Sequence, residues 1–453
     1  MNIVIVGNGK VGFALAEELA KENHDITLID TNGDKLEHSA ELLDITYAVG
    51  NGASYLVQRD ANVQAAELFI AATSTDEVNM LCCLMASKLG CKNTIARVRN
   101  PEYDEHLYLL EDELGLSMSI NPERAAAVEI ARLISYPSAI SAGSFVKGRA
   151  DLIEIRLGED SGLCGQNLAE IRRKYPVNIL IYAVERGEKL FIPSGDFVLM
   201  PNDNIHLSGN QKRIVEFLRL VNSQGRKIKS VLIIGGGSIT YYLAKMLLEI
   251  GIGVRIIEMS RSRCEELCRL LPPALVIEGD GTERDLLAEV GLGEVDAFIA
   301  LTDIDEENLI ISMYAAKEGV PKVITKLNRL SYLDVVKNTG IDSIVSPKQI
   351  TATQIIQYVR AKQNTGGSQV KALYRIANDK AEVMEFVATS STVNVGKKLK
   401  DCRIRKNTLI AALVHDGGVI IPHGDDIINE GDSVIIVTSV DEPLMDLNGI
   451  FLK

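Results

Sequence analysis

The sequence predicts an α/β protein with two parallel-sheet domains, each followed by a small α+β domain. Two observations lead to this prediction. A short apolar run ends in a Gly-x-Gly turn at residues 7–9 and again at residues 235–237, 228 residues later. The next apolar run ends in an acid in both places, at Asp30 and at Glu258, with the same offset. This pattern is typical of a dinucleotide site, and its repetition indicates a duplicated Rossmann-like unit.

The first predicted Rossmann-like domain covers residues 1–136, where short apolar runs alternate with helical patterns. Such alternation is typical of βαβ units and a parallel sheet. Strands are expected at 2–6, 26–30, 45–49, 67–72, 94–98 and 117–120, and helices at 10–22, 76–89 and 125–135. Asn121 is expected to cap the last of these helices, with Pro122 at its first position.

The other predicted domains cover residues 145–225, 229–360 and 370–453. The middle one repeats the order of the first domain. In the other two, apolar and polar residues alternate in short runs, as in half-buried strands. These runs lie at 151–157, 178–184, 204–207, 383–388, 408–414 and 433–437. Stretches rich in small, polar or charged residues, at 137–149, 222–229 and 362–369, are interpreted as linkers.

Charge and composition argue against several classes of protein. The 453 residues carry a formal net charge of −13, which argues against nucleic acid or an anionic bilayer as the partner. The seven cysteines are scattered and form no CxxC pair, so no metal site is predicted. The chain starts directly in a predicted strand and has no apolar run of about 20 residues. We therefore expect a cytoplasmic protein that meets a membrane only through a partner.

The first glycine-rich turn matches the G-x-G-x-x-G fingerprint completely. Its six positions are Gly7, Asn8, Gly9, Lys10, Val11 and Gly12. The three glycines allow the tight turn, the approach of a pyrophosphate and close packing of the helix, in that order. The start of this helix directs free N–H groups at phosphates. Asp30 is predicted to accept both ribose hydroxyls and to repel a 2′-phosphate, which favours NAD(H), or an adenine nucleotide, over NADP. The alternative is a turn that only tightens the corner.

Further candidate residues follow the carboxyl ends of the other strands, where ligands of such sheets lie. These residues are Asn51, Ala53, Thr73, Ser74 and Arg97. Asn51 and Ala53 are placed to reach the adenine, and Thr73 and Ser74 to line the phosphates. Arg97 is interpreted either as a phosphate partner, for which guanidinium is well suited, or as half of a surface salt bridge.

The second glycine-rich turn departs from the fingerprint. Thr240 replaces the third glycine, which predicts a displaced helix and weaker, different or lost nucleotide binding. Glu258 keeps the ribose acceptor, and a polar turn remains after the third strand. Lys326 stands where the first copy has Arg97. The candidate residues of this second site are Gly235, Gly236, Gly237, Ser238, Ile239, Glu258, Asp280 and Lys326.

Together these motifs resemble the RCK (or KTN) family of potassium-transport regulators. The resemblance rests on segments 3–12, 29–30, 120–127 and 279–282. It implies that the Rossmann-like domains bind NAD(H), or ATP and ADP, and that the small domains are regulatory. It also implies a ring of eight Rossmann-like domains, hence a homotetramer. Such a ring would lie on the cytoplasmic face of the inner membrane, under an integral-membrane potassium-translocating subunit.

An NAD-dependent oxidoreductase is the alternative function, because the fingerprint alone does not distinguish binding from hydride transfer. A dehydrogenase needs an acid or base beside the nicotinamide. None of the six histidines recurs at the matching position of the other copy, and none lies in a catalytic motif. We therefore predict a sensor without catalytic residues. A nucleotide-independent scaffold is the third hypothesis.

Overall fold

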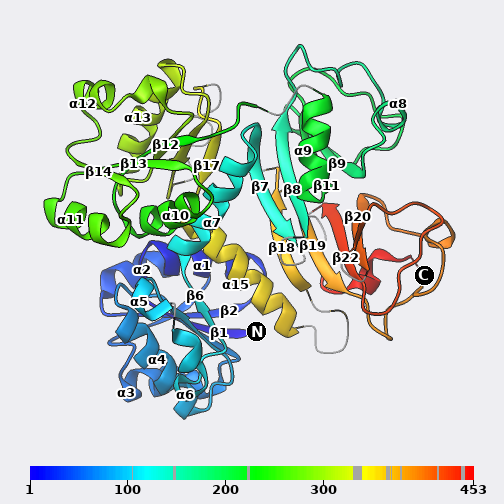
Figure 1. The fold of residues 1–453 in the computed structure, drawn as a ribbon. Helices are drawn as coiled ribbons and strands as arrows, with labels where there is room; N and C mark the ends of the chain where they lie inside the picture. Colours follow the sequence, from blue (N-terminus) through cyan, green and yellow to red (C-terminus); the bar gives the residue numbers. More distant parts are fainter. Residues whose placement is uncertain are drawn as a thin grey trace.

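The computed structural model describes most of the chain as four sheets joined by helices (Figure 1). The described residues are 1–104, 106–145, 149–221, 225–329, 339–363, 368, 370–377, 380–415, 418–439 and 444–452. Two sheets are parallel and two antiparallel, which confirms the predicted fold class. The linkers expected at 222–229 and 362–369 lie partly outside the described residues, at 222–224, 364–367 and 369. Among the described residues, no helix combines the length and apolar character needed to cross a bilayer.

The first parallel sheet has the order β3-β2-β1-β4-β5-β6. Its strands are β1 (Asn2–Val6), β2 (Asp25–Asp30), β3 (Thr46–Val49), β4 (Leu68–Ala71), β5 (Thr94–Arg97) and β6 (Met118–Ile120). Its helices are α1 (Lys10–Lys21), α2 (Gly33–Leu42), α3 (Tyr55–Asp60), α4 (Asp76–Leu89), α5 (Pro101–Asp104), α6 (Glu111–Leu114) and α7 (Pro122–Ser135). Strands are added to one side of β1 as far as β3, and then to its other side from β4 onward. Ligands of such folds bind at this switch point, at the carboxyl ends of β1 and β4.

The second parallel sheet repeats this order as β14-β13-β12-β15-β16-β17. Its strands are β12 (Ser230–Ile234), β13 (Gly253–Glu258), β14 (Leu275–Glu278), β15 (Ala297–Ala300), β16 (Val323–Lys326) and β17 (Ser343–Val345). Its helices are α10 (Ser238–Glu249), α11 (Arg261–Leu270), α12 (Arg284–Glu289), α13 (Asp305–Lys317) and α15 (Pro347–Gln363).

The two Rossmann-like domains exchange their last helices. Helix α7 leaves the first domain and packs against α10 of the second, where Ile130 shares a core with Leu243. Helix α15 leaves the second domain and packs against α1 of the first, where Ile355 shares a core with Leu15. Asn121 caps α7 as predicted, since its side chain accepts from the backbone N–H of Arg124. Each exchanged helix thus packs against the helix that begins at the other domain's glycine-rich turn.

The first antiparallel sheet has the order β10-β9-β11-β8-β7. Its elements are β7 (Ala139–Phe145), β8 (Ala150–Arg156), α8 (Leu168–Lys174), β9 (Ile179–Arg186), β10 (Lys189–Phe191), β11 (Asn204–Gly209) and α9 (Gln211–Leu220). The prediction of a linker at 137–149 is wrong for residues 139–145, which form strand β7. Its small residues suggested a flexible segment, but Ala139, Ala142 and Phe145 are buried and the strand pairs with β8. Residues 146–148 of that expected linker lie outside the described part.

The second antiparallel sheet faces the first. Its strands are β18 (Val370–Ile376), β19 (Ala381–Val387), β20 (Thr408–His415), β21 (Gly418–Ile420) and β22 (Ser433–Ser439), in the order β18-β19-β22-β20-β21. Leu152 and Tyr182 of the first sheet share a core with Val383 of the second. The rings of Phe145 and Tyr374 lie 4.9 Å apart between their centroids. The two small domains therefore form one packed unit (Figure 1).

A buried ion-pair network joins the first Rossmann-like domain to the second small domain. Arg360 of α15, 1% exposed, donates to both oxygens of Glu22, the residue that caps the end of α1, at 2.6 and 3.1 Å. It also donates to both oxygens of Glu382 on β19, at 2.7 and 2.9 Å. Arg375 of β18 pairs with Glu18 and with Glu22. Helix α1, which starts at the first glycine-rich turn, is thus tied at its far end to the second small domain.

Candidate nucleotide-binding site

A cavity of about 800 Å³ lies between the two Rossmann-like domains. The first domain supplies its glycine-rich turn, Asp30 at the end of β2, and the ends of β4 and β5. The second domain supplies the start of α10. The sequence-predicted residues that line the cavity are Gly7, Asn8, Gly9, Lys10, Val11, Asp30, Asn51, Thr73, Ser74, Arg97, Gly237, Ser238, Ile239 and Lys326. Residues assigned to two separate sites thus meet in one cavity.

The three glycines of the first turn have different surroundings. Gly7 has φ +98°, and a Cβ there would lie 2.8 Å from the carbonyl oxygen of Ala72, so only glycine fits. A Cβ on Gly12 would lie 1.8 Å from the carbonyl oxygen of Gly7, so α1 packs directly on the turn. A Cβ on Gly9 would meet nothing within 4 Å. Gly9 therefore leaves open space in front of the backbone N–H groups that begin α1.

The carboxylate of Asp30 is held by the turn itself. One oxygen accepts from the backbone N–H of Asn8 at 2.6 Å and the other from that of Asn32 at 2.9 Å. The Asn8 side chain points to α2, where it donates to the carbonyl oxygen of Lys35 at 2.9 Å and the hydroxyl of Ser39 at 2.8 Å. Asn8 thus contributes its backbone to the site, and its side chain anchors the turn. The remaining lone pairs of Asp30 are available to ribose hydroxyls.

The ends of β4 and β5 are joined by Asn79, to which the sequence analysis assigned no role. Its side-chain oxygen accepts from the backbone N–H and hydroxyl of Thr73, at 2.8 and 2.7 Å. Its amide nitrogen donates to the carbonyl oxygen of Arg97 at 2.9 Å. In the second copy Asn308 makes the same backbone bonds to Thr302 and Lys326. The recurrence of a buried asparagine at matching positions of both copies was the available signal.

Arg97 forms a salt bridge, and its role as a phosphate partner stays a prediction. Its guanidinium donates to Glu123 at 3.0 Å, but the pair is largely buried and faces the cavity instead of the surface. Burial lowers the pKa of Arg97, and the negative charge of Glu123 opposes that shift. Arg99, which the sequence analysis missed, also lines the cavity, and its guanidinium donates to the carbonyl oxygen of Ser74. Both guanidiniums are therefore positioned beside the predicted phosphate region.

The cavity is basic although the protein is acidic. Six cationic side chains line it, namely Lys10, Lys35, Arg97, Arg99, Lys326 and Lys348. Three acidic side chains line it, namely Asp30, Glu123 and Asp303. In a chain of net charge −13, this local excess of positive charge favours an anionic ligand. None of the described residues that line the cavity is a histidine.

The second turn holds its acid in the same way but differs at its third position. Glu258 accepts from the backbone N–H groups of Gly236 and Ser260, both at 2.7 Å. Thr240 is fully buried, and its hydroxyl donates to the carbonyl oxygen of Gly235. A Cβ at the matching Gly12 would lie 1.8 Å from the carbonyl oxygen of Gly7, so the first turn has no room for a threonine. The displacement of α10 expected from Thr240 stays a prediction.

Several predicted site residues lie away from the cavity. Among the described lining residues, Gly12, Ala53, Gly235, Gly236, Glu258 and Asp280 do not occur. Asp280 accepts from the backbone N–H and hydroxyl of Thr282, at 2.8 and 2.7 Å, and these bonds lower its pKa. Asn51 does line the cavity, and its side-chain oxygen accepts from the backbone N–H of Ala53 at 3.0 Å. Lys326 pairs with Asp303 at 3.0 Å.

Comparison with known proteins places the chain in a family. The model of the TrkA-N domain matches residues 3–122 and 231–347, and that of the TrkA-C domain matches residues 152–222 and 383–444. These matches cover more than half of the chain. The chain belongs to the TrkA family. The resemblance to the RCK (or KTN) family is therefore confirmed, and the matching members of that family are TrkA proteins.

Relatives in this family match over nearly their whole length. The Trk system potassium uptake protein TrkA of Halomonas elongata is 34% identical over 457 residues, covering 100% of this chain and 98% of the relative. The TrkA homolog 1 of Methanosarcina mazei is 35% identical over 444 residues, covering 96% and 97%. The solved structure of the GsuK RCK domain superposes with TM-score 0.63 at 20% identity, covering 97% of this chain and 92% of that one. The GsuK channel bound to NAD superposes with TM-score 0.64 at 20% identity, covering 97% and 77%. These structures show a shared fold.

Proposed function

We propose that this chain is a cytosolic regulatory subunit of a potassium uptake system, and that it gates a membrane transporter in response to NAD(H) or to ATP and ADP. Relatives at 31–35% identity over nearly the full chain are named as Trk system potassium uptake proteins. The proposed partner is an integral-membrane potassium-translocating subunit of the TrkH/TrkG type. It would hold four copies of the chain, a homotetramer, on the cytoplasmic face of the inner membrane.

The observation that carries this proposal is the shared cavity. A nucleotide with its ribose at Asp30 and its phosphates at Gly9 would lie in a cavity that Ser238 and Lys326 of the other Rossmann-like domain also line. The nucleotide would therefore contact both Rossmann-like domains at once. A ligand shifts a conformational equilibrium only by its difference in affinity for the two states. Contacts with both domains supply such a difference whenever their relative orientation changes.

The required energy is within reach of a multi-site assembly. Moving a population from 1:99 to 99:1 takes about 5.5 kcal/mol of differential affinity. Hydrogen bonds to charged groups each contribute about 1.5–3 kcal/mol. Four identical chains in one ring would divide the total among them, so that one or two altered contacts per cavity suffice.

The exchanged helices provide a route from the cavity to the small domains. Helix α15 packs on α1, whose first turn carries the proposed phosphate site. Through Arg360, α15 is also tied to Glu382 of the second small domain. A rotation between the Rossmann-like domains would therefore move the small-domain unit. We infer that this coupling transmits nucleotide binding to the transporter.

The test is potassium flux through the reconstituted transporter with its regulatory subunit, measured with and without each nucleotide. We expect the flux to depend on nucleotide with the natural chain. With Asp30→Ala we expect the flux to lose this dependence. Glu258→Ala is the matched control, because Glu258 makes the same backbone contacts outside the cavity. Flux that responds equally in the natural chain and Asp30→Ala would refute the proposal. Substrate-dependent oxidation or reduction of the nucleotide by the purified chain would instead support an oxidoreductase.

A further inference from the structure

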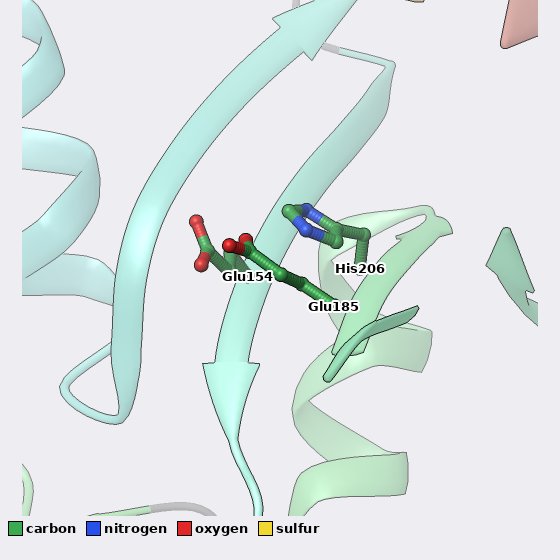
Figure 2. Close-up of side chains that lie close together, drawn as sticks. All are labelled: Glu154, Glu185 and His206. Carbon is green, nitrogen blue, oxygen red and sulfur yellow. The ribbon is translucent and has the colours of Figure 1, made fainter. Parts of the chain in front are cut away.

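His206 on β11 has a buried ring nitrogen without a partner. The residue is 1% exposed, and its Nε2 has no hydrogen-bond partner in the structure. Buried polar atoms are nearly always paired, so an unpaired one calls for an explanation such as an ion. Figure 2 shows that the imidazole is directed toward the carboxylates of Glu154 and Glu185.

Three neighbouring strands bring these side chains together. Glu154 of β8 lies directly opposite His206 in the sheet register. Glu185 of β9 lies opposite Asn204, two residues before His206 on β11. Since side chains two residues apart share a face, all three point to the same side of the sheet. One ligand-type atom from each lies within 4.8 Å of the other two.

The carboxylate of Glu154 is oriented by further residues. One oxygen accepts from the hydroxyl of Ser141 on β7 at 2.8 Å. The other accepts from the side-chain amide of Asn204 at 3.0 Å. Metal-binding carboxylates and histidines are commonly fixed by such outer hydrogen bonds, which set the direction of the remaining lone pairs.

We propose that Glu154, Glu185 and His206 bind one divalent transition-metal ion of the zinc class. Zn²⁺ and similar ions accept imidazole nitrogen together with carboxylate oxygen, whereas Mg²⁺ and Ca²⁺ prefer oxygen ligands alone. Small side-chain rotations would bring the three ligand atoms close enough together for each to lie about 2.0–2.2 Å from a central Zn²⁺.

The second small domain offers a built-in comparison. Its sheet places Glu385 opposite Ile435, and Val414 two residues away in the register, opposite Ser433. These positions match Glu154, His206 and Glu185 in that order. Only the glutamate on the first of the three strands is kept, so the proposal assigns one ion to each chain. The site escaped the sequence analysis, which predicted no metal, because its ligands come from three strands and form no short motif.

The position of the site suggests what the ion would do. Leu152 shares a strand and a face with Glu154, and it lies in the core between the two small domains. Ala183 has the same relation to Glu185. An ion there would join β8, β9 and β11 beside this shared core. It would therefore be expected to raise the thermal stability of the small-domain unit by mass action.

The experiment is equilibrium dialysis and calorimetry of the full-length, metal-stripped chain with Zn²⁺, and separately with Mg²⁺ and Ca²⁺, in the absence of nucleotide. We expect one Zn²⁺ per chain, a rise in Tm, and much weaker binding of Mg²⁺ and Ca²⁺. His206→Gln and Glu154→Gln should abolish this site. Glu385→Gln, the matched control on β19, should retain it.

A milder variant keeps the test decisive if the ligand variants fold poorly. Ser141→Ala removes only the hydrogen bond that orients Glu154, and it should weaken Zn²⁺ binding by about 10-fold. Absence of stoichiometric Zn²⁺ binding by the natural chain would overturn the proposal, as would unchanged binding in a folded His206→Gln variant. Preference for Ca²⁺ or Mg²⁺ over Zn²⁺ would overturn the assigned ion class. Because no nucleotide is present, the result is independent of the function proposed above.

Discussion

The hydroxyl of Thr240 donates a hydrogen bond to the carbonyl oxygen of Gly235, where the first copy instead packs Gly12 against Gly7. Both turns keep the first two glycines of the fingerprint, and only the second turn replaces the third glycine. In the first turn the helix starts in contact with the strand–helix corner, and in the second a side chain lies between them. The difference makes the first turn the better candidate for holding phosphates.

Alanine should lower stability at one glycine of the first turn and leave it unchanged at another. Gly12→Ala would place a Cβ 1.8 Å from the carbonyl oxygen of Gly7, so α1 must move, at a cost of about 1–3 kcal/mol. Gly9→Ala meets nothing within 4 Å and should leave the Tm unchanged while weakening nucleotide binding. Thermal unfolding and calorimetric titration measure the two effects. A lower Tm in Gly9→Ala than in Gly12→Ala would contradict the assigned packing.

Removal of the acid at β2 should weaken nucleotide binding selectively. Loss of hydrogen bonds from a charged acceptor costs about 1.5–3 kcal/mol, so Asp30→Ala should raise the Kd for NADH or ATP roughly 10- to 100-fold. Glu258→Ala should leave the tighter of any two binding events unchanged, because Glu258 does not line the described cavity. Isothermal titration with each nucleotide gives both numbers. The assignment fails if the two variants are affected equally.

The buried network around Arg360 should be essential for stability. Arg360→Met leaves the carboxylates of Glu22 and Glu382 buried without this partner, and such losses cost about 3–5 kcal/mol. Lys398→Met breaks the exposed pair with Asp425 and should cost less than about 1 kcal/mol. Chemical denaturation measures both. We also expect Arg360→Met to reduce the effect of nucleotide on flux, and an unaltered response would argue against the route through α15.

Lys322 should make stability depend on pH in the alkaline range. It is 1% exposed and donates to the carbonyl oxygen of Ala139 and, at 3.0 Å, to the hydroxyl of Ser343. Burial lowers its pKa from 10.5 to about 8, while Asp342 opposes the shift. Between these pH values the unfolded chain binds a proton that the folded chain has released, so the free energy of unfolding rises with pH.

The measurement compares the natural chain with Lys322→Met from pH 7 to pH 11. The difference in unfolding free energy should change by roughly 3 kcal/mol in favour of the natural chain as pH rises, with each pKa unit equal to about 1.4 kcal/mol. Lys317→Met, at an exposed position near the end of α13, is the control. Parallel pH profiles for the natural chain and Lys322→Met would show that this lysine keeps its ordinary pKa in the fold.

Much of the fold was predictable because it depends on local pattern. The apolar runs of the first domain predicted β1 to β6 to within two residues, and Asn121 and Pro122 predicted the start of α7. Strand β7 was missed because its alanines, serines and glycine are typical of linkers. Its burial comes from pairing with β8 and from contacts with the other small domain, which local composition does not report.

The sequence by itself determined the duplication, the complete fingerprint at Gly7–Gly12 and its defect at Thr240, because each depends on residues close together in the chain. Only the tertiary structure decided that the two turns open into one cavity, that Arg97 faces it while paired with Glu123, and that Glu154, Glu185 and His206 converge. The physical reason is the same in each case. These relationships are set by the exchange of α7 and α15 and by strand register, which bring distant residues into contact through packing.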